Sequence, residues 1–247
     1  MTVERAVAAD WDSLECEPVT TMKSEEPGGT LMVFLHGYGG TGAGYTRFAK
    51  RWGNSRVRVC LPESPLLHAH SGGRMWWEFL EEDWPQYFRD EPAWDANSRP
   101  SRQLAAASAG IAKMIGRLRT RYKPERVVVA GHSQGAMLAM DVAAMPSVHA
   151  DTAVLVAGGL LIDSVKKLAH ARSDRPQAFL FHSRNDPLVP YSEAERATKV
   201  LRKLGLTVSF RSFNDGHALS APMVGEIERI ANGPGNTSAT AATGASL

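Results

Sequence analysis

The stretch "RVVVAGHSQGAMLAMDVAA", Arg126 to Ala144, decides the fold that this chain is expected to adopt. A run of valines leads into a serine that lies between two glycines, and a helix-forming run follows directly. The pattern G-x-S-x-G gains chemical meaning from this order of strand, tight turn and helix, because the turn exposes the serine hydroxyl at a helix N-terminus. Ser133 is therefore interpreted as a nucleophile rather than as an incidental turn residue.

Apolar runs on both sides of this stretch predict further strands. Most of them are continuously apolar rather than alternating, which is typical of strands covered on both faces. The six predicted strands are "TLMVFLH" (30–36), "VRVCL" (57–61), "RVVVAG" (126–131), "TAVLVAG" (152–158), "AFLFHS" (178–183) and "LTVSFRS" (206–212).

Helical spacing of apolar residues predicts helices between these strands. One covers about 101–121, one follows Ser192, and a last one covers Met223 to Ala231. Ser192 and Glu195 are expected to form a capping box at the start of the second helix, which Gly205 ends. Strands that alternate with helices predict an α/β fold, with a mostly parallel central sheet flanked by helices on both faces.

Length and composition fit one domain of this kind. The chain has 247 residues, of which 43% are hydrophobic and 22% are charged, and this suits a single α/β domain with a well-buried core. We expect a loosely ordered lead-in over residues 1–29 and the domain itself over residues 30–231. The small, polar, Gly-rich stretch over residues 232–247 is expected to be disordered.

Net charge, apolar runs and cysteine content limit which partners and which cellular location are expected for this chain. A net charge of +2 is too small to indicate a nucleic-acid partner, and no apolar run reaches the roughly 20 residues of a membrane span. Cys16 and Cys60 are the two cysteines, and a chain of this size needs no disulfide. Because the start shows no signal-peptide pattern, the expected location is cytoplasmic, without integral membrane association. The oligomeric state stays open.

In a parallel sheet, functional residues gather just after the strands, at their carboxyl ends. The first strand is followed by "HGYGGTG", residues 36–42, whose glycines free backbone N–H groups to face a cleft. Such a loop holds either a phosphate or the oxyanion of an acyl-transfer reaction. It lacks the Lys-Ser/Thr ending of a P-loop and the spacing of a dinucleotide fingerprint, which favours the oxyanion interpretation.

A serine hydroxyl becomes a good nucleophile only when a base takes its proton. Candidates follow two other strands: Asp186 in "RNDPLVP" and His217 in "FNDGHALS". The order serine, acid, histidine is the one expected of an α/β-hydrolase. Asp163 and Asp215 are rival acids, although Asp215 lies on the same loop as the histidine. The isolated H-x-H of residues 68–70 has no companion ligands, and no metal site is predicted.

Four segments taken together resemble one family. "FLHGYGGTG", "GHSQGAM", "HSRNDPLVP" and "DGHALS" are similar to the phospholipase/carboxylesterase family, which includes the acyl-protein thioesterases and has the α/β-hydrolase fold. The resemblance spans about residues 30–231. It implies a catalytic triad of Ser133, Asp186 and His217 that transfers an acyl group to water without a cofactor.

The resemblance also implies how the substrate is held. The backbone N–H groups of Tyr38 and Gln134 would form the oxyanion hole. "GGRMWWEF" resembles the family's aromatic stretch near the acyl pocket, so Trp76, and with it Leu66, are candidate substrate contacts; the alternative is that such residues are core. The chain departs from the family in the acidic, aromatic insert Glu81–Trp94.

A second departure is "GHSQGA", where the eukaryotic thioesterases typically have "GFSQGG". Both departures favour a carboxylesterase for small-molecule esters, or thioesters, of short to medium acyl chains. The alternative is a lysophospholipase or acyl-protein thioesterase for long acyl chains. A binding protein without catalysis is a third hypothesis, which the presence of all three triad residues disfavours.

Overall fold

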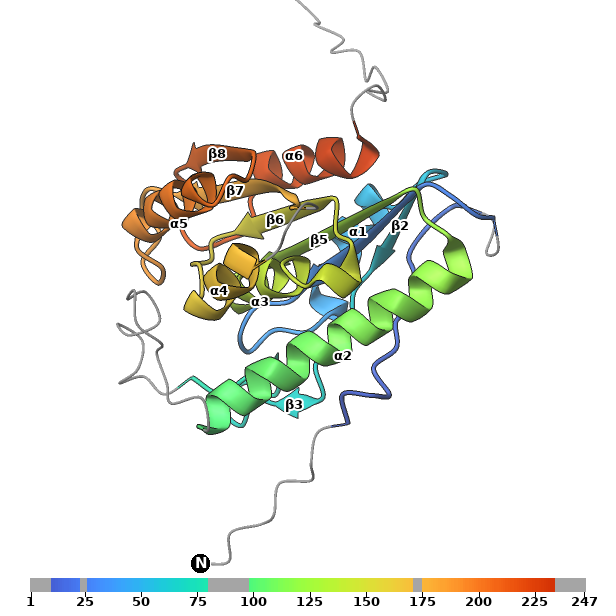
Figure 1. Ribbon diagram of the computed structural model, residues 1–247, viewed down its shortest axis with the longest axis horizontal. Coiled ribbons are helices and arrows are strands. Elements are labelled where there is room, and N and C mark those ends of the chain that lie inside the picture. The colour runs from blue at the N-terminus through green and yellow to red at the C-terminus, as the bar shows by residue number, and fades with distance from the viewer. Residues whose placement is uncertain (1–9, 23–25, 80–97, 171–174, 234–247) are drawn as a thin grey trace, which may run out of the picture.

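A computed structural model describes residues 10–22, 26–79, 98–170 and 175–233 of the protein. Within these residues, six strands form one sheet in the order β2-β1-β5-β6-β7-β8, and every neighbouring pair is parallel (Figure 1). The strands are β1 Thr30–Leu35, β2 Val57–Cys60, β5 Arg126–His132, β6 Thr152–Val156, β7 Gln177–Ser183 and β8 Val208–Phe213. The predicted parallel sheet is confirmed.

A two-stranded antiparallel hairpin lies apart from this sheet. It pairs β3, Leu66–Leu67, with β4, Arg74–Met75. No pattern in the sequence predicted this hairpin. Two-residue strands are too short to show a periodic pattern.

Helices cover both faces of the large sheet. They are α1 Thr46–Trp52, α2 Arg99–Tyr122, α3 Gln134–Ala143, α4 Ile162–His170, α5 Tyr191–Lys203 and α6 Ala221–Asn232, with short 3-10 turns η1 Ala43–Tyr45 and η3 Pro146–Val148. Alternate residues of β1 show the two layers. Leu31 and Val33 pack with residues of α2 to α5, whereas Met32 and Phe34 pack with residues of α1 and α6. This two-sided burial explains the continuously apolar strands.

Of the two ends of α5, one was predicted correctly from the sequence and the other was not. Gly205, at φ +84°, follows the end of α5 as predicted. The predicted capping box is wrong, because α5 begins at Tyr191, so that Ser192 lies inside its first turn. The N-cap is Pro190, whose carbonyl accepts the Glu193 N–H at 2.9 Å.

The described part of the lead-in packs against the domain. Val19 forms an antiparallel bridge with Val59 of β2, and Leu14 belongs to the buried core. The limits of the lead-in at residue 29 and of the domain at residue 231 stay predictions. The predicted disorder of the tail beyond residue 233 and the insert Glu81–Trp94 lie outside the described residues.

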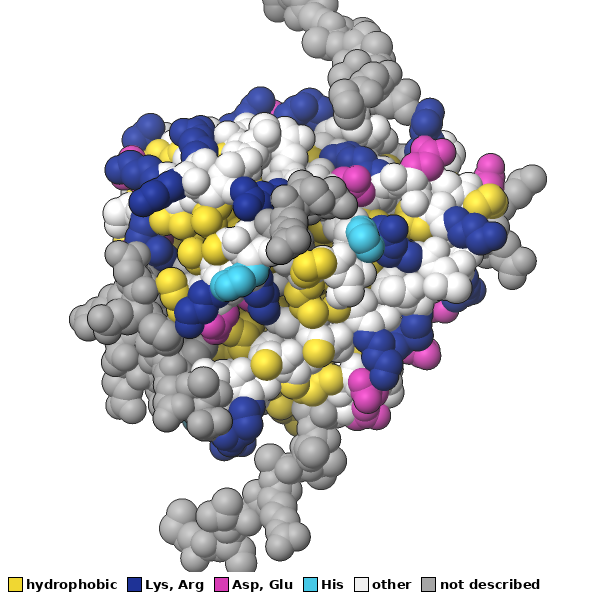
Figure 2. Space-filling view, in the orientation of Figure 1, with side chains coloured by type: hydrophobic (Ala, Val, Ile, Leu, Met, Phe, Trp, Pro, Cys, Tyr) yellow, Lys and Arg dark blue, Asp and Glu magenta, His cyan; other side chains and the backbone are white. Residues whose placement is uncertain are grey.

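The surface of the described residues is mixed in charge. Figure 2 shows Lys and Arg side chains spread over one face among acidic and apolar ones. At the end of α2, Arg121 forms an ion pair with Glu17 at 3.2 Å, and Arg117 donates to the Leu14 carbonyl. No helix in the described ranges is both long enough and apolar enough to cross a bilayer.

Candidate active site

Ser133 occupies a strained turn between β5 and α3. Its backbone has φ 55° and ψ −119°, a region that a residue other than glycine enters at a cost of about 1–3 kcal/mol. The glycines on either side allow the close contact between strand and helix. A Cβ on Gly131 would lie 2.2 Å from the Gly135 carbonyl oxygen, and one on Gly135 would lie 2.2 Å from the Leu35 carbonyl oxygen. Only glycine fits at both positions.

The end of β6 supports this turn from the side. The Ser133 N–H donates to the Val156 carbonyl at 2.8 Å, and the Ser133 carbonyl accepts the Ala136 N–H at 2.9 Å. Gly158 also lies against the turn, since a Cβ there would be 2.6 Å from the Ala136 Cβ. These contacts hold the strained backbone in place and so fix the position from which the Ser133 side chain projects.

Three loops at the carboxyl edge bring the predicted triad together. His217, after β8, has its Nε2 2.9 Å from the Ser133 Oγ. Its Nδ1 lies 2.8 Å and 3.0 Å from the two carboxylate oxygens of Asp186, after β7. An ionised carboxylate can only accept, so Nδ1 carries the proton and Nε2 is free to accept the serine hydroxyl proton. The arrangement can therefore carry out base-assisted nucleophilic attack.

The side chain of Asp186 is buried and accepts several hydrogen bonds. Its Oδ1 accepts the backbone N–H groups of Leu188 and Val189, each at 2.9 Å. Burial raises the pKa of this carboxyl, but the hydrogen bonds from His217 and from the two backbone groups outweigh it and hold the pKa below its usual value. Asp186 is thus an anion at neutral pH and can stabilise a positively charged His217.

Neither rival acid is placed in this way. Asp163 lies in the first turn of α4 and faces Lys166 at 3.7 Å. Asp215 donates its backbone N–H to the Ser183 Oγ at 3.2 Å and so helps to fix the loop that carries His217. Among the described contacts of the histidine ring, the carboxylate partner is Asp186.

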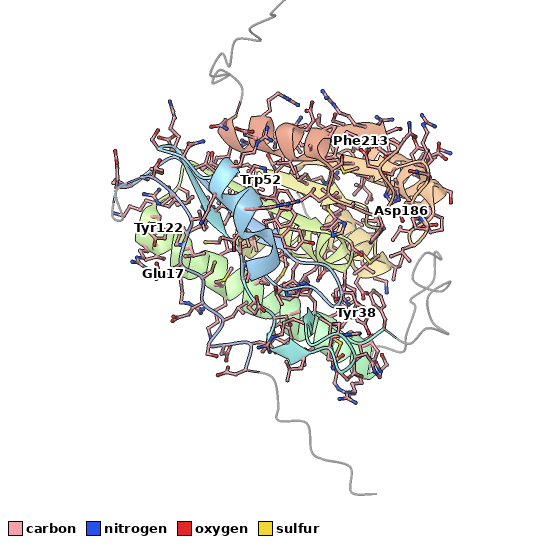
Figure 3. All side chains as sticks on the ribbon, turned by 180° about the vertical axis from the view of Figure 1, so that it is seen from behind. Glu17, Tyr38, Trp52, Tyr122, Asp186 and Phe213 are labelled. Carbon is pink, nitrogen blue, oxygen red and sulfur yellow. The ribbon has the colours of Figure 1, made fainter. Side chains whose placement is uncertain are left out.

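The two predicted oxyanion donors belong to segments that lie next to Ser133. Gln134 is the first residue of α3, so its N–H has no acceptor within the helix and lies at the positive end of the helix dipole. Tyr38 follows Gly37, where a Cβ would lie only 3.4 Å from the Ser133 Cβ. Gly39 anchors the loop by donating its N–H to the Arg74 carbonyl at 2.8 Å. In Figure 3, Tyr38 and Asp186 lie on the same side of the molecule.

Trp76 is buried in this structure, and its role as a substrate contact stays a prediction. Its side chain is 0% exposed, and its ring stacks on the His36 ring at a centroid distance of 4.6 Å. The indole Nε1–H donates to the His36 carbonyl at 2.8 Å. The Trp76 backbone N–H donates to the Gln134 side-chain oxygen at 2.9 Å. Trp76 therefore supports the start of the loop after β1 from within the core. Leu66 is half-buried in β3, and its role as a substrate contact stays a prediction.

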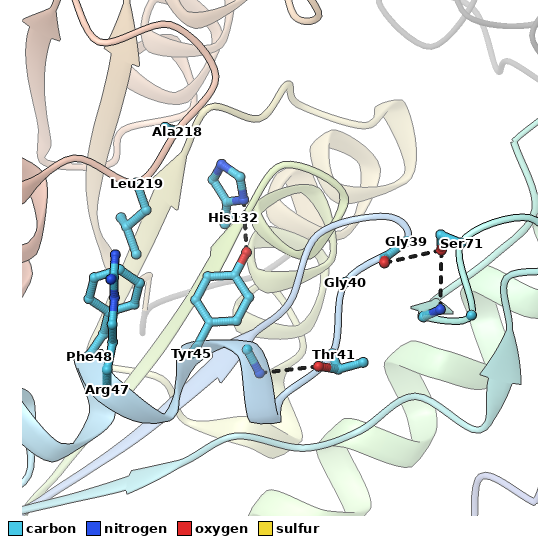
Figure 4. A pocket seen from close by; sticks show the side chains of 13 residues that line it. Gly39, Gly40, Thr41, Tyr45, Arg47, Phe48, Ser71, His132, Ala218 and Leu219 are labelled. Atoms are coloured by element: carbon cyan, nitrogen blue, oxygen red, sulfur yellow. Dashed lines mark hydrogen bonds between the residues drawn. The ribbon is translucent and has the colours of Figure 1, made fainter.

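Figure 4 shows a cavity of about 560 Å³ near this edge of the sheet. Its walls come from the glycine loop after β1, from η1 and α1, from the turn at residues 71–73, and from the residues next to Ser133 and His217 in sequence; the three triad residues do not themselves line it. The lining includes Gly39, Gly40, Tyr45, Arg47, Phe48, His132, Ala218 and Leu219. The volume lies within the roughly 300–1,000 Å³ typical of small-molecule sites.

Sequence reasoning missed several residues that shape this site. Neither His132 nor Tyr45 was singled out from the sequence, yet the two side chains bond to each other at 2.9 Å. His182, buried at the end of β7, bonds to the Val189 carbonyl at 2.9 Å and lies 3.5 Å from Asp186. Such pairings join residues far apart in sequence or inside strands, and no local pattern reveals them. Across the described ranges, no three His, Cys, Asp or Glu side chains group as metal ligands.

The sequence of this chain is similar to those of known proteins. A family model described as Phospholipase/Carboxylesterase matches residues 17–231. An acyl-protein thioesterase 1 of Gibberella zeae is 24% identical over 219 residues, which cover 80% of this chain and 87% of the relative. An acyl-protein thioesterase 1 of Saccharomyces cerevisiae is 28% identical over 177 residues, which cover 67% of this chain and 74% of the relative.

Solved structures share the fold. The crystal structure of esterase PE8 superposes with a TM-score of 0.69 at 19% identity, covering 87% of this chain and 96% of that one. The Bacillus cereus carboxylesterase gives a TM-score of 0.64 at 17% identity, covering 89% and 94%. With the six-stranded parallel sheet in the described residues, these likenesses confirm the predicted α/β-hydrolase fold.

Proposed function

Since the chain belongs to the phospholipase/carboxylesterase family, we propose that it is a serine hydrolase that cleaves carboxylic esters or thioesters through an acyl-enzyme intermediate. The observation that carries this proposal is the continuous hydrogen-bonded series from Ser133 Oγ to His217 Nε2 at 2.9 Å, and from His217 Nδ1 to Asp186 at 2.8 Å. Fold alone would not support it, because one fold hosts many functions.

In the first half-reaction, Ser133 Oγ attacks the substrate carbonyl carbon while His217 Nε2 takes the hydroxyl proton. The resulting imidazolium is stabilised by Asp186, whose hydrogen bonds keep it ionised. The tetrahedral intermediate collapses when His217 gives its proton to the leaving alcohol or thiol. Water then attacks the acyl-enzyme with His217 as base, and Ser133 recovers its proton as the carboxylic acid leaves.

The negative charge on the carbonyl oxygen is held by the N–H groups of Tyr38 and Gln134. This role is supported by the position of Gln134 at the start of α3 and by the close passage of the Gly37 loop over Ser133. Removing one oxyanion donor typically costs about 3–4 kcal/mol of barrier reduction.

We expect esters of short to medium acyl chains, because the chain departs from the thioesterase pattern in "GHSQGA" and in the insert Glu81–Trp94. The relatives named acyl-protein thioesterase favour the alternative of a long acyl chain. Hydrolysis rates over a series of acyl-chain lengths decide between the two.

The test is hydrolysis of p-nitrophenyl esters from acetate to palmitate, with a thioester in parallel. Wild type, Ser133→Ala and the control Ser147→Ala, an exposed serine in η3, are compared. We expect wild type and the control to be active and Ser133→Ala to be inactive, with the highest kcat/KM below about ten acyl carbons. Equal activity of Ser133→Ala would contradict the proposal. A maximum at palmitate would favour the long-chain alternative.

A further inference from the structure

The side chain between Gly131 and Ser133 has no part in the chemistry described above. His132 Nε2 lies 2.7 Å from the backbone carbonyl of His217. His132 Nδ1 lies 2.9 Å from the Tyr45 hydroxyl, as the dashed line in Figure 4 shows. The two histidine rings are 5.1 Å apart between centroids. His132 therefore connects η1, the serine turn and the loop of the catalytic histidine.

The chemistry of the partners fixes the proton positions. A backbone carbonyl can only accept, so His132 Nε2 carries a proton and donates to His217. In the neutral ring, Nδ1 then has a lone pair, which accepts the Tyr45 hydroxyl proton. In this series Tyr45 O–H donates to His132 Nδ1 and His132 Nε2–H donates to the His217 carbonyl; these proton positions are those of a neutral His132 and a protonated Tyr45.

Both groups are in the required state at neutral pH. Burial, helped by the neighbouring His217, lowers the pKa of His132 to about 4, and the nearby Asp186 and a hydrogen bond with the His217 backbone offset only part of this. Burial raises the pKa of Tyr45 to about 12, against a smaller opposing effect of the Gly37 backbone.

The loop of His217 needs such a contact. On the N-terminal side it is fixed through Asp215, whose N–H donates to Ser183 Oγ at 3.2 Å. Gly216, at φ +65°, donates to Asn185 Oδ1 at 3.1 Å. The His217 carbonyl itself is held by His132 Nε2. Because the His217 ring must reach Ser133 on one side and Asp186 on the other, a small shift of this carbonyl would misplace both ring nitrogens.

We propose that His132 and Tyr45 form a positioning pair that fixes the backbone of His217 and so aligns its ring for proton transfer. The proposal rests on the function proposed above, because it assigns His217 as the base. Displacing a catalytic group by about 1 Å can cost on the order of 100-fold in rate. The pair therefore acts on kcat through His217, without contact with the reacting atoms.

Three variants separate positioning from general stability. His132→Phe keeps a ring of similar size but removes both nitrogens, Tyr45→Phe removes one hydroxyl, and His132→Gln offers an amide N–H to the His217 carbonyl. The control is His170→Phe, at an exposed position at the end of α4. We measure kcat, KM and the thermal unfolding midpoint with p-nitrophenyl butyrate.

We expect kcat to fall about 10- to 100-fold in His132→Phe and by a smaller factor in Tyr45→Phe, with KM within about threefold of wild type. His132→Gln should recover a large part of the loss, and His170→Phe should match wild type. The proposal is overturned if folded His132→Phe keeps wild-type kcat, or if the Gln variant is no better than the Phe variant.

If His132→Phe does not fold, Tyr45→Phe decides by itself, and an unchanged kcat overturns the proposal. Failure of the proposed function looks different. In that case wild type is inactive on all esters, or Ser133→Ala keeps the activity, irrespective of the His132 variants.

Discussion

The half-buried, neutral His132 makes the stability of this protein fall as the pH is lowered. The pKa of His132 is lowered from 6.5 to about 4 in the folded chain, chiefly by burial. Below pH 6.5 the unfolded chain therefore takes up a proton on this residue and the folded chain does not. The free energy of unfolding is unaffected above pH 6.5 and falls as the pH is lowered from 6.5 to about 4.

The size of the effect follows from the two pKa values. Between pH 7.5 and pH 4.5, His132 by itself should lower the free energy of unfolding by about 2.5 kcal/mol. Burial also lowers the pKa of His36 and of His182, and these contribute with the same sign. The stabilisation from Asp186, whose pKa is lowered, is lost only at still lower pH, near and below its unfolded pKa of 3.8.

Urea unfolding of wild type and His132→Phe at the two pH values isolates the residue, because all other titrating groups cancel in the difference. Wild type should lose about 2.5 kcal/mol more than the variant between pH 7.5 and pH 4.5. Parallel losses within about 0.5 kcal/mol would refute the reasoning, since His132 would then have the same pKa in the folded and unfolded chains.

Further substitutions test other parts of the site. Asp186→Asn should lower kcat by about 10⁴-fold with the fold intact, whereas Asp163→Asn should leave ester hydrolysis unchanged; the reverse result would reassign the acid. Gly135→Ala should lower the free energy of unfolding in urea by about 1–3 kcal/mol, because the new Cβ would lie 2.2 Å from a backbone oxygen of β1. An unchanged unfolding midpoint would show that the turn can widen. Trp76→Phe leaves the His36 carbonyl without its indole donor and should lower the free energy of unfolding by about 1–3 kcal/mol. The acyl-chain preference should stay that of wild type. A changed preference would instead support Trp76 as a substrate contact.

The parallel sheet could be predicted because its strands are buried on both faces. Runs such as Thr30–Leu35 read as continuously apolar, and the structure confirms them as strands. Helices α1 and α4 were missed because they are short, with 7 and 9 residues, and offer too few apolar positions to show a period. The capping box at Ser192 failed because a proline two residues earlier already starts the helix.

The proposed triad could be predicted because its residues follow strands of a parallel sheet, whose ends meet at one edge. No such rule predicts which side chains meet when their segments are distant in sequence. The bond between Tyr45 and His132 spans 87 positions, and each residue looks ordinary in its own segment. The aromatic cluster around Trp76 could line a pocket or fill the core, and composition does not separate the two. The hydrogen bond from its indole to His36 places it in the core.

Covalent labelling tests the central claim most directly. Wild type is reacted with a fluorophosphonate, and the adduct is measured by intact mass and located by peptide mapping, with Ser133→Ala and Asp186→Asn in parallel. We predict one adduct per chain, on Ser133, absent in Ser133→Ala and formed at least about 100-fold more slowly in Asp186→Asn. An adduct on another residue, or ester hydrolysis that continues at full rate after labelling of Ser133, would contradict the assignment of Ser133 as the nucleophile.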